Sequence, residues 1–230
     1  MTRKTYVFAG ASSKTAIETA KQLKAEGNRV IGISTKSERI LYDEFYTVDK
    51  YGFTSFPEIP ESIDGLVYFP GTINLKPFNR ITEGDFINDY QINSLGAAAF
   101  IQSYLPNLKK GTNPSIVLIS TVAVAIGMPF HSSIAMAKGA IEGLTKSLAA
   151  EFAPTIRVNC IAPSLTDTPI AEKFVNTPEK FEASQKRNPL RKVGQPTDLA
   201  NAIEFLLSEK SGWVTGQVIG IDGGMNNLKV

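Results

Sequence analysis

The chain has 230 residues, a formal net charge of +2 and a single cysteine, Cys160. With 43% hydrophobic and 20% charged residues it matches the averages of globular proteins, which excludes a disordered chain or a disulfide scaffold. So balanced a charge gives no argument for nucleic acid or an anionic membrane as a partner. One cysteine and one histidine, His131, are too few ligands for a typical zinc site, so no metal is expected.

The chain carries no sign of a membrane or export segment. No apolar stretch approaches the ~18 residues that a spanning helix needs. The apolar run that follows the basic residues near the N-terminus is too short for a signal peptide. We therefore expect a cytoplasmic protein with no membrane partner.

Short apolar runs alternate with helical patterns along the chain. The first predicted strand covers residues 6–9, and a helix over 16–26 follows, with Gly27 as its left-handed C-terminal residue. The other predicted strands are 29–33, 45–49, 65–69, 115–120, 155–161 and 217–221, and the other helices are 82–105, 133–152 and 198–208. Such alternation predicts an α/β fold: one doubly wound, Rossmann-type domain over residues 1–230 with a seven-stranded, mainly parallel sheet.

Three segments depart from this regular pattern. The helix predicted over 82–105 contains Ser94-Leu95-Gly96, where we expect a break. Residues 49–65 are rich in phenylalanine and proline, and predict a loop where a crossover helix is expected. Residues 165–193 are polar and interrupted by prolines, which favours a mobile lid over a substrate.

The turn after the first strand is built from small residues. It reads Gly10-Ala11-Ser12-Ser13-Lys14-Thr15-Ala16. Such a turn at a helix N-terminus lets backbone N–H groups approach a pyrophosphate, and the serine and threonine hydroxyls add donors. Because the turn lacks the GxGxxG glycines, it also suits an ordinary strand-to-helix turn with serine caps.

The segment after the second strand bears on the choice of cofactor. An acidic residue there would hold an adenosine ribose, but the chain has Ser34-Thr35-Lys36-Ser37-Glu38-Arg39. Hydroxyls and cations favour a 2′-phosphate, so the prediction is NADP(H) in preference to NAD(H), with Lys14 as a second cation. A solvated, positively charged loop is the alternative.

Three segments of the second half resemble the short-chain dehydrogenase/reductase family. They are RVNCIAP at 157–163, NPLRKVGQPTDLA at 188–200 and TGQVIGIDGG at 215–224. The resemblance covers nearly the whole chain and is nearest to 3-oxoacyl-ACP reductases. It implies an oxidoreductase acting on a carbonyl or enoyl group of a small-molecule or carrier-linked acyl substrate, in a homotetramer or homodimer.

The resemblance also implies roles for individual residues. Asn93 matches an asparagine that holds a proton-relay water, and Lys138 matches the active-site lysine at the nicotinamide ribose. Where the family has Asn-Ala-Gly, this chain has Phe69-Pro70-Gly71, so only Gly71 carries over. The implied cofactor contacts are Gly10, Ser12, Ser13, Lys14, Ala16, Ser34, Thr35, Lys36, Asp49, Gly71, Lys138, Pro163 and Thr168.

The catalytic positions depart from the family pattern. The tyrosine expected four residues before the lysine is Ile134, which donates no proton. The usual serine is Thr121, preceded by Ser120, and either hydroxyl is a candidate to orient a carbonyl. Enoyl-ACP reductases have a similar first turn and place their tyrosine seven residues before the lysine, where this chain has His131. His131 is therefore a candidate proton donor, with an exposed loop histidine as the alternative.

Three hypotheses for the function remain open at this point. The first is an NADP(H)-dependent reductase with a non-standard proton donor. The second is a catalytically silent relative that binds dinucleotide as a sensor or partner subunit, which Ile134 motivates. The third is a doubly wound domain that binds another ligand.

Overall fold

Seven parallel strands form one sheet in the computed structural model, which describes residues 3–37 and 41–229. The sheet runs in the order β3-β2-β1-β4-β5-β6-β7, and every neighbouring pair is parallel. The predicted α/β class is confirmed, and the sheet is parallel throughout. The strands are β1 (Thr5–Ala9), β2 (Arg29–Ser34), β3 (Glu44–Thr47), β4 (Gly65–Tyr68), β5 (Ser115–Ile119), β6 (Arg157–Pro163) and β7 (Val218–Ile221).

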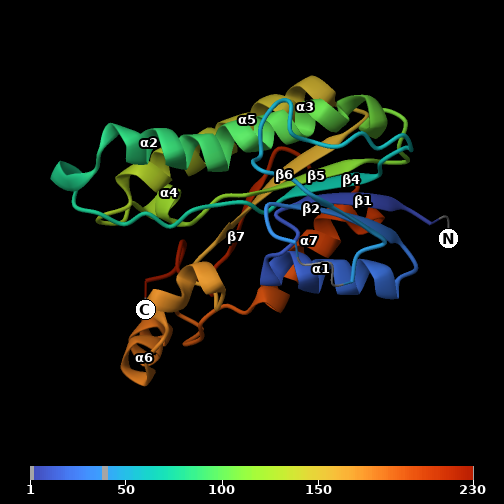
Figure 1. The fold of residues 1–230 in the computed structure, drawn as a ribbon. Helices are drawn as coiled ribbons and strands as arrows, with labels where there is room; N and C mark the ends of the chain where they lie inside the picture. The colour runs from blue at the N-terminus through green and yellow to red at the C-terminus, as the bar shows by residue number, and fades with distance from the viewer. Residues whose placement is uncertain (1–2, 38–40, 230) are drawn as a thin grey trace.

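Helices cover both faces of this sheet (Figure 1). On one face, α1 (Lys14–Ala25) packs against α7 (Pro196–Leu207). On the other face lie α2 (Glu83–Tyr90), α3 (Gly96–Leu108) and α5 (Ser132–Phe152). Because helices bury the sheet on both sides, its central strands are continuous apolar runs without alternation. Within the described ranges, no helix has the length and apolar character that a membrane span needs.

The first helix begins and ends at the residues that its sequence indicates. Ser13 is the N-cap, and its Oγ accepts a hydrogen bond from the Ala16 amide at 3.1 Å. At the other end Gly27 has φ +83°, and the amides of Gly27 and Asn28 donate to the carbonyls of Lys24 and Leu23. This Schellman arrangement satisfies the last carbonyls of the helix and confirms Gly27 as its terminator.

Two predicted helices differ in detail from those observed. The helix predicted over 82–105 divides into α2 and α3 around a π-helical turn, Gln91–Leu95, so the expected break exists. The helix predicted from residue 198 begins at Pro196 instead. Gln195 is its N-cap, and the Asp198 carboxylate reaches back to accept from the Gln195 amide at 2.8 Å, as an N3 residue does.

The two irregular segments also take definite shapes. Residues 49–64 contain neither helix nor strand, as predicted. The proposed lid, 165–193, holds a 3-10 helix, Pro169–Phe174, and the short helix α6, Pro178–Arg187. In Figure 1, α6 projects away from the sheet.

The order of the strands opens a crevice in the middle of the sheet. From β1 the chain builds toward β2 and β3, whereas from β4 it builds through β5 and β6 to β7. The segments that follow β1 and β4 therefore diverge from each other at the carboxyl ends of these two strands. This switch point is where open α/β sheets bind their ligands.

Candidate active site

A cavity of about 1270 Å³ lies at the switch point. Its wall combines the turn after β1, the end of β2, the segment after β4, the first turns of α5 and the lid. Ligand pockets usually measure about 300–1,000 Å³. The cavity therefore has room for a dinucleotide together with a small substrate.

Gly10 brings the turn after β1 against the segment after β4. Its φ is +72°, and a Cβ there would lie 2.8 Å from Pro70 Cδ. Only glycine fits this backbone without moving Pro70, and glycine adds no side chain of its own beside the start of α1. Backbone N–H groups at a helix N-terminus suit a phosphate group, so the turn fits a dinucleotide.

The other predicted residues of this turn take different positions. Ser12, Ser13 and the exposed Lys14 line the cavity. Ala16 does not line it: this residue is buried under the turn, and its amide is occupied by the Ser13 cap.

The end of β2 is tied to the first turn by serine hydroxyls. The Ser34 Oγ donates to Ser12 Oγ at 2.9 Å and accepts from the Lys36 amide at 3.2 Å. Ser34 is fully buried and does not line the cavity, whereas Thr35, Lys36 and Asp49 do. Ser34 thus holds Ser12 and the Lys36 amide, which belong to residues that line the cavity. Glu38 and Arg39 lie outside the described residues.

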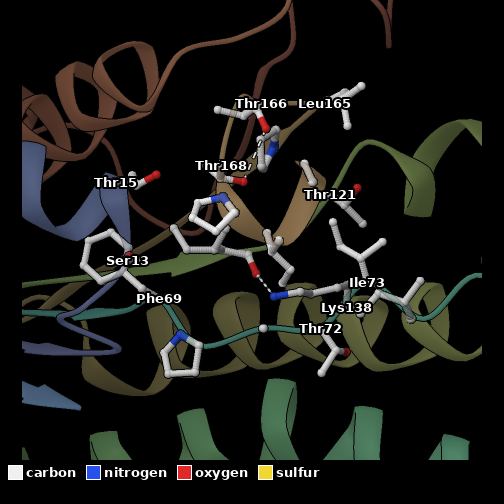
Figure 2. A pocket seen from close by; sticks show the side chains of 18 of the residues that line it. Ser13, Thr15, Phe69, Thr72, Ile73, Thr121, Lys138, Leu165, Thr166 and Thr168 are labelled. Carbon is white, nitrogen blue, oxygen red and sulfur yellow. Dashed lines mark hydrogen bonds between the residues drawn. The ribbon is translucent and has the colours of Figure 1, made fainter. Parts of the chain in front are cut away.

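Lys138 reaches from α5 into the floor of the cavity (Figure 2). Its Nζ donates to the Ile119 carbonyl at 2.7 Å, and the residue is only 7% exposed. Burial lowers the pKa of this ammonium group to about 8. Ile134 lies one helical turn earlier on the same wall, so the position of the family's tyrosine is aliphatic here.

A buried polar network lies behind Gly71. Thr72 Oγ1 donates to Asp89 Oδ1 at 2.6 Å and accepts from Asn93 Nδ2 at 2.9 Å. Asn93 is fully buried on the π-helical turn and does not itself line the cavity. A Cβ on Gly71 would lie 3.2 Å from Asn93 Oδ1 and 3.4 Å from Lys138 Nζ, so both atoms border one small space.

The acceptors in this network are not all satisfied. Among the described residues, Asn93 Oδ1 and Asp89 Oδ2 are buried without a hydrogen-bond partner. Buried polar atoms in native proteins almost always have a partner. The orphaned Asn93 oxygen therefore fits a water or a ligand hydroxyl beside Lys138.

The two candidate hydroxyls after β5 differ in what they contact. Ser120 Oγ donates to Glu142 Oε1 at 2.6 Å. Thr121 Oγ1 accepts from the Ala123 amide at 3.3 Å and lines the cavity, so its own proton can be donated to a ligand. Thr121 is better placed than Ser120 to bind a carbonyl oxygen.

His131 is a half-buried residue of the cavity wall, immediately before α5. Its Nδ1 lies 2.8 Å from the Pro129 carbonyl oxygen. Because a carbonyl oxygen only accepts, Nδ1 carries a proton and Nε2 is the atom free to exchange one. His131 can therefore donate from Nε2 only as the imidazolium.

The tyrosines nearest to this region use their hydroxyls in contacts with the backbone. Tyr68 Oη donates to the Ile92 carbonyl at 2.6 Å, and Tyr104 Oη donates to the Pro57 carbonyl at 2.8 Å. In the described part of the cavity wall the single tyrosine is Tyr51, whose Oη accepts from the Thr35 amide at 3.3 Å. Tyr51 thus contacts the segment that follows β2.

The far wall is formed by the end of β6 and the proposed lid, residues 165–193. Pro163 and Thr168 line the cavity, and Thr168 Oγ1 donates to the Thr166 carbonyl at 3.3 Å. Reasoning from the sequence missed Thr72 and Asp89, whose pairing joins two segments that no pattern connects. It also missed the lid residues Lys180 and Arg187, although their spacing suits one face of a helix.

Sequence comparison then identifies the family. Residues 52–226 match the family model described as enoyl-(acyl carrier protein) reductase. The chain belongs to the short-chain dehydrogenase/reductase family. Members of this family are oxidoreductases that bind a nicotinamide dinucleotide, so the resemblance seen in the sequence is confirmed.

Individual members of the short-chain dehydrogenase/reductase family are similar over much of the chain. A 3-oxoacyl-[acyl-carrier-protein] reductase of Thermotoga maritima is 38% identical over 180 residues, 77% of this chain and 68% of that protein. Tropinone reductase-like 3 of Erythroxylum coca is 30% identical over 95% of this chain and 82% of its own. The match to a tropinone reductase homolog of Arabidopsis thaliana spans 52% of that relative.

A solved structure of the same family confirms the Rossmann-type fold. Ligand-free aldohexose dehydrogenase of Thermoplasma acidophilum superposes with a TM-score of 0.89 at 27% identity. The superposition covers 99% of this chain and 97% of that structure.

Proposed function

We propose that the protein is an NADP(H)-dependent oxidoreductase that reduces a carbonyl or enoyl group of an acyl-type substrate. The observation that carries this proposal is the shared cavity: Lys138 and Thr121 lie on the same wall as the Gly10 turn and Lys36. A bound nicotinamide dinucleotide would supply the hydride. The residues of the chain then have to hold the cofactor, orient the substrate and supply a proton.

The preference for NADP(H) rests on two cations at one end of the cavity. Lys14 and Lys36 are both exposed on the wall, and neither forms an ion pair within the described residues. Two cations without carboxylate partners favour a 2′-phosphate. Asp49 lies on the same wall, where the adenine of the cofactor would sit.

The proton donor is proposed to be His131 in place of the family's tyrosine. Thr121 would donate a hydrogen bond to the carbonyl oxygen, and Lys138 would hold the nicotinamide ribose. Asn93 would hold a water in the space beside Gly71. The Ser120 hydroxyl donates its proton to Glu142, so Ser120 would support this wall of the cavity and would not bind the substrate.

We also propose a homodimer or homotetramer in the cytoplasm. α5 presents the small residues Ala140, Gly143 and Ser147 along a shallow groove beside Leu95 and Ala98 of the neighbouring helices. Small residues allow a helix of a second copy to approach closely.

A turnover assay tests the proposed function. Purified protein is mixed with NADPH or NADH and a panel of ketones, 3-oxoacyl thioesters and enoyl thioesters, and the nicotinamide absorbance is followed. We expect oxidation of NADPH on at least one substrate, and a loss of about 10²–10⁴-fold in kcat for His131→Gln. Absence of turnover with every substrate would overturn the proposal.

The variant Ile134→Tyr separates the proposal from a catalytically silent relative. If wild type is inactive and Ile134→Tyr reduces a ketone, the cavity is intact and the native protein is a silent binder of dinucleotide. If wild type is active and His131→Gln is as active as wild type, the reductase stands but His131 is not its proton donor.

A further inference from the structure

The lid helix α6 sorts its charges by face. Four of its residues line the cavity, and they are spaced i, i+3, i+4 and i+7: Lys180, Ala183, Ser184 and Arg187. Such spacing forms a single stripe along a helix. The acidic residues of the same helix, Glu179 and Glu182, do not line the cavity. The charged residues of the stripe that faces the cavity are therefore both basic, and Lys180 and Arg187 lie about 10 Å apart along the helix axis.

No carboxylate neutralises this stripe in the part of the chain that the structure describes. Lys180 Nζ contacts only the Lys173 carbonyl at 3.1 Å and Asn176 Oδ1 at 3.0 Å. Arg187 has no ion pair there, whereas its neighbour Lys186, off the cavity, pairs with Glu182 at 2.6 Å. Within the described residues, α6 thus has an acidic partner for Lys186, which lies off the cavity, and none for Lys180 and Arg187, which line it.

The rest of the lid wall has the same sign of charge. Lys173 lines the cavity beside α6, with its Nζ 5.0 Å from the ring of Phe174. Among the described lining residues, the single carboxylate is Asp49, which lies at the β2 end. These three exposed cations line one space with no carboxylate beside them, and a bound anion would complement their charge.

We infer that the substrate carries an anionic group, a carboxylate or a phosphate, which Lys180 and Arg187 of the lid bind. This inference rests on the proposed function, because it names the substrate class of the same cavity. Arg187 can hold either group through two parallel hydrogen bonds, and Lys180 adds a point charge. The reacting carbonyl would then lie toward Thr121 and Lys138, with the anionic end toward α6.

Matched substrates and variants test this inference. The carboxylate pair is a 3-oxo acid and its methyl ester, and the phosphate pair is a phosphorylated hydroxyketone and its dephosphorylated form. In the double variant Lys180→Gln/Arg187→Gln we expect KM for the preferred anion to rise about 10- to 100-fold, with kcat and the neutral substrate little changed. The pair that shows the larger effect identifies the anion. Lys186→Gln, on the outer face of α6, should behave as wild type.

Binding measurements separate this inference from the proposed function. The complex with NADPH is titrated calorimetrically with the acid and with its ester. Binding of the acid that is lost in the double variant, without any turnover, supports the inference and overturns the function. Turnover with equal KM for anionic and neutral substrates supports the proposed function and overturns this inference. If the double variant instead binds NADPH at least tenfold more weakly and still treats acid and ester alike, the lid cations serve the cofactor and the inference is wrong.

Discussion

The burial of Lys138 makes the stability of the protein depend on pH in a defined direction. Desolvation lowers its pKa from 10.5 to about 8, so the folded protein releases this proton at a lower pH than the unfolded chain does. The destabilisation is fully present below pH 8 and is relieved as the pH rises toward 10.5. Its full size is roughly 3 kcal/mol. We expect urea midpoints of wild type to rise between pH 7 and 10 relative to those of Lys138→Met. Parallel pH profiles of the two proteins would contradict this.

Thr72 makes a second prediction at the scale of single residues. Its hydroxyl joins Asp89 to Asn93 inside the molecule, and both of these residues are fully buried. Thr72→Val removes one donor and one acceptor without changing the volume of the side chain. We expect the free energy of unfolding to fall by about 1–3 kcal/mol in chemical denaturation. Thr72→Ser keeps the hydroxyl and should lose much less. Equal losses in the two variants would show that the methyl group, not the network, matters.

At the scale of elements, the close approach of two segments depends on Gly10. A side chain there would meet Pro70 at 2.8 Å and would also have to adopt a φ of +72°. Gly27 is the matched control, because its φ is +83° and a Cβ would meet nothing within 4 Å. We expect Gly27→Ala to lower stability by about 1 kcal/mol and Gly10→Ala to lower it by at least twice as much. Only Gly10→Ala should also weaken NADPH binding. If both variants bind NADPH as wild type does, the turn does not hold the cofactor.

Most elements could be predicted because each has a local cause. The buried strands are continuous apolar runs, and α1 ends at Gly27 through its positive φ. The break before α3 was also visible, but its π-helical form was not. The turn packs against α5, where Ser94 Oγ donates to the Ala137 carbonyl at 2.7 Å. A sequence pattern does not contain the contacts between elements, so it does not predict the exact form of a helical turn.

The candidate site shows the same division. Lys138 and Asn93 could be found because the family places them at fixed spacings, and the structure brings them to one space beside Gly71. The hydrogen bond between Thr72 and Asp89 could not be predicted, because it joins a loop to a helix that no sequence pattern connects. The basic face of α6 was missed because residues 165–193 were predicted only as a lid, and without a helix the spacing of Lys180 and Arg187 has no meaning.

At the scale of the whole molecule, the net charge is only +2, but positive charges predominate on the described wall of the cavity. The described cavity wall carries seven lysine or arginine residues and one carboxylate, that of Asp49. Composition therefore gave no sign of an anionic ligand, although the cavity favours one. The wall also draws on segments from Gly10 to Met225, so a ligand bound there contacts both halves of the chain.

Cofactor binding should therefore stabilise the entire fold, and the size of the effect reports cofactor choice. A ligand present at 100 times its Kd raises the free energy of unfolding by about 2.7 kcal/mol. At equal concentrations we expect NADPH to raise the melting temperature more than NADH does. In Lys14→Ala/Lys36→Ala the shift with NADPH should fall to that with NADH, since the 2′-phosphate loses both of its cations. Lys21→Ala is the control, because Lys21 pairs with Glu18 on α1 and does not line the cavity. Equal shifts with the two cofactors in wild type would show that these lysines do not select between them, and the hydroxyls of the β2 end would then contact a ribose instead.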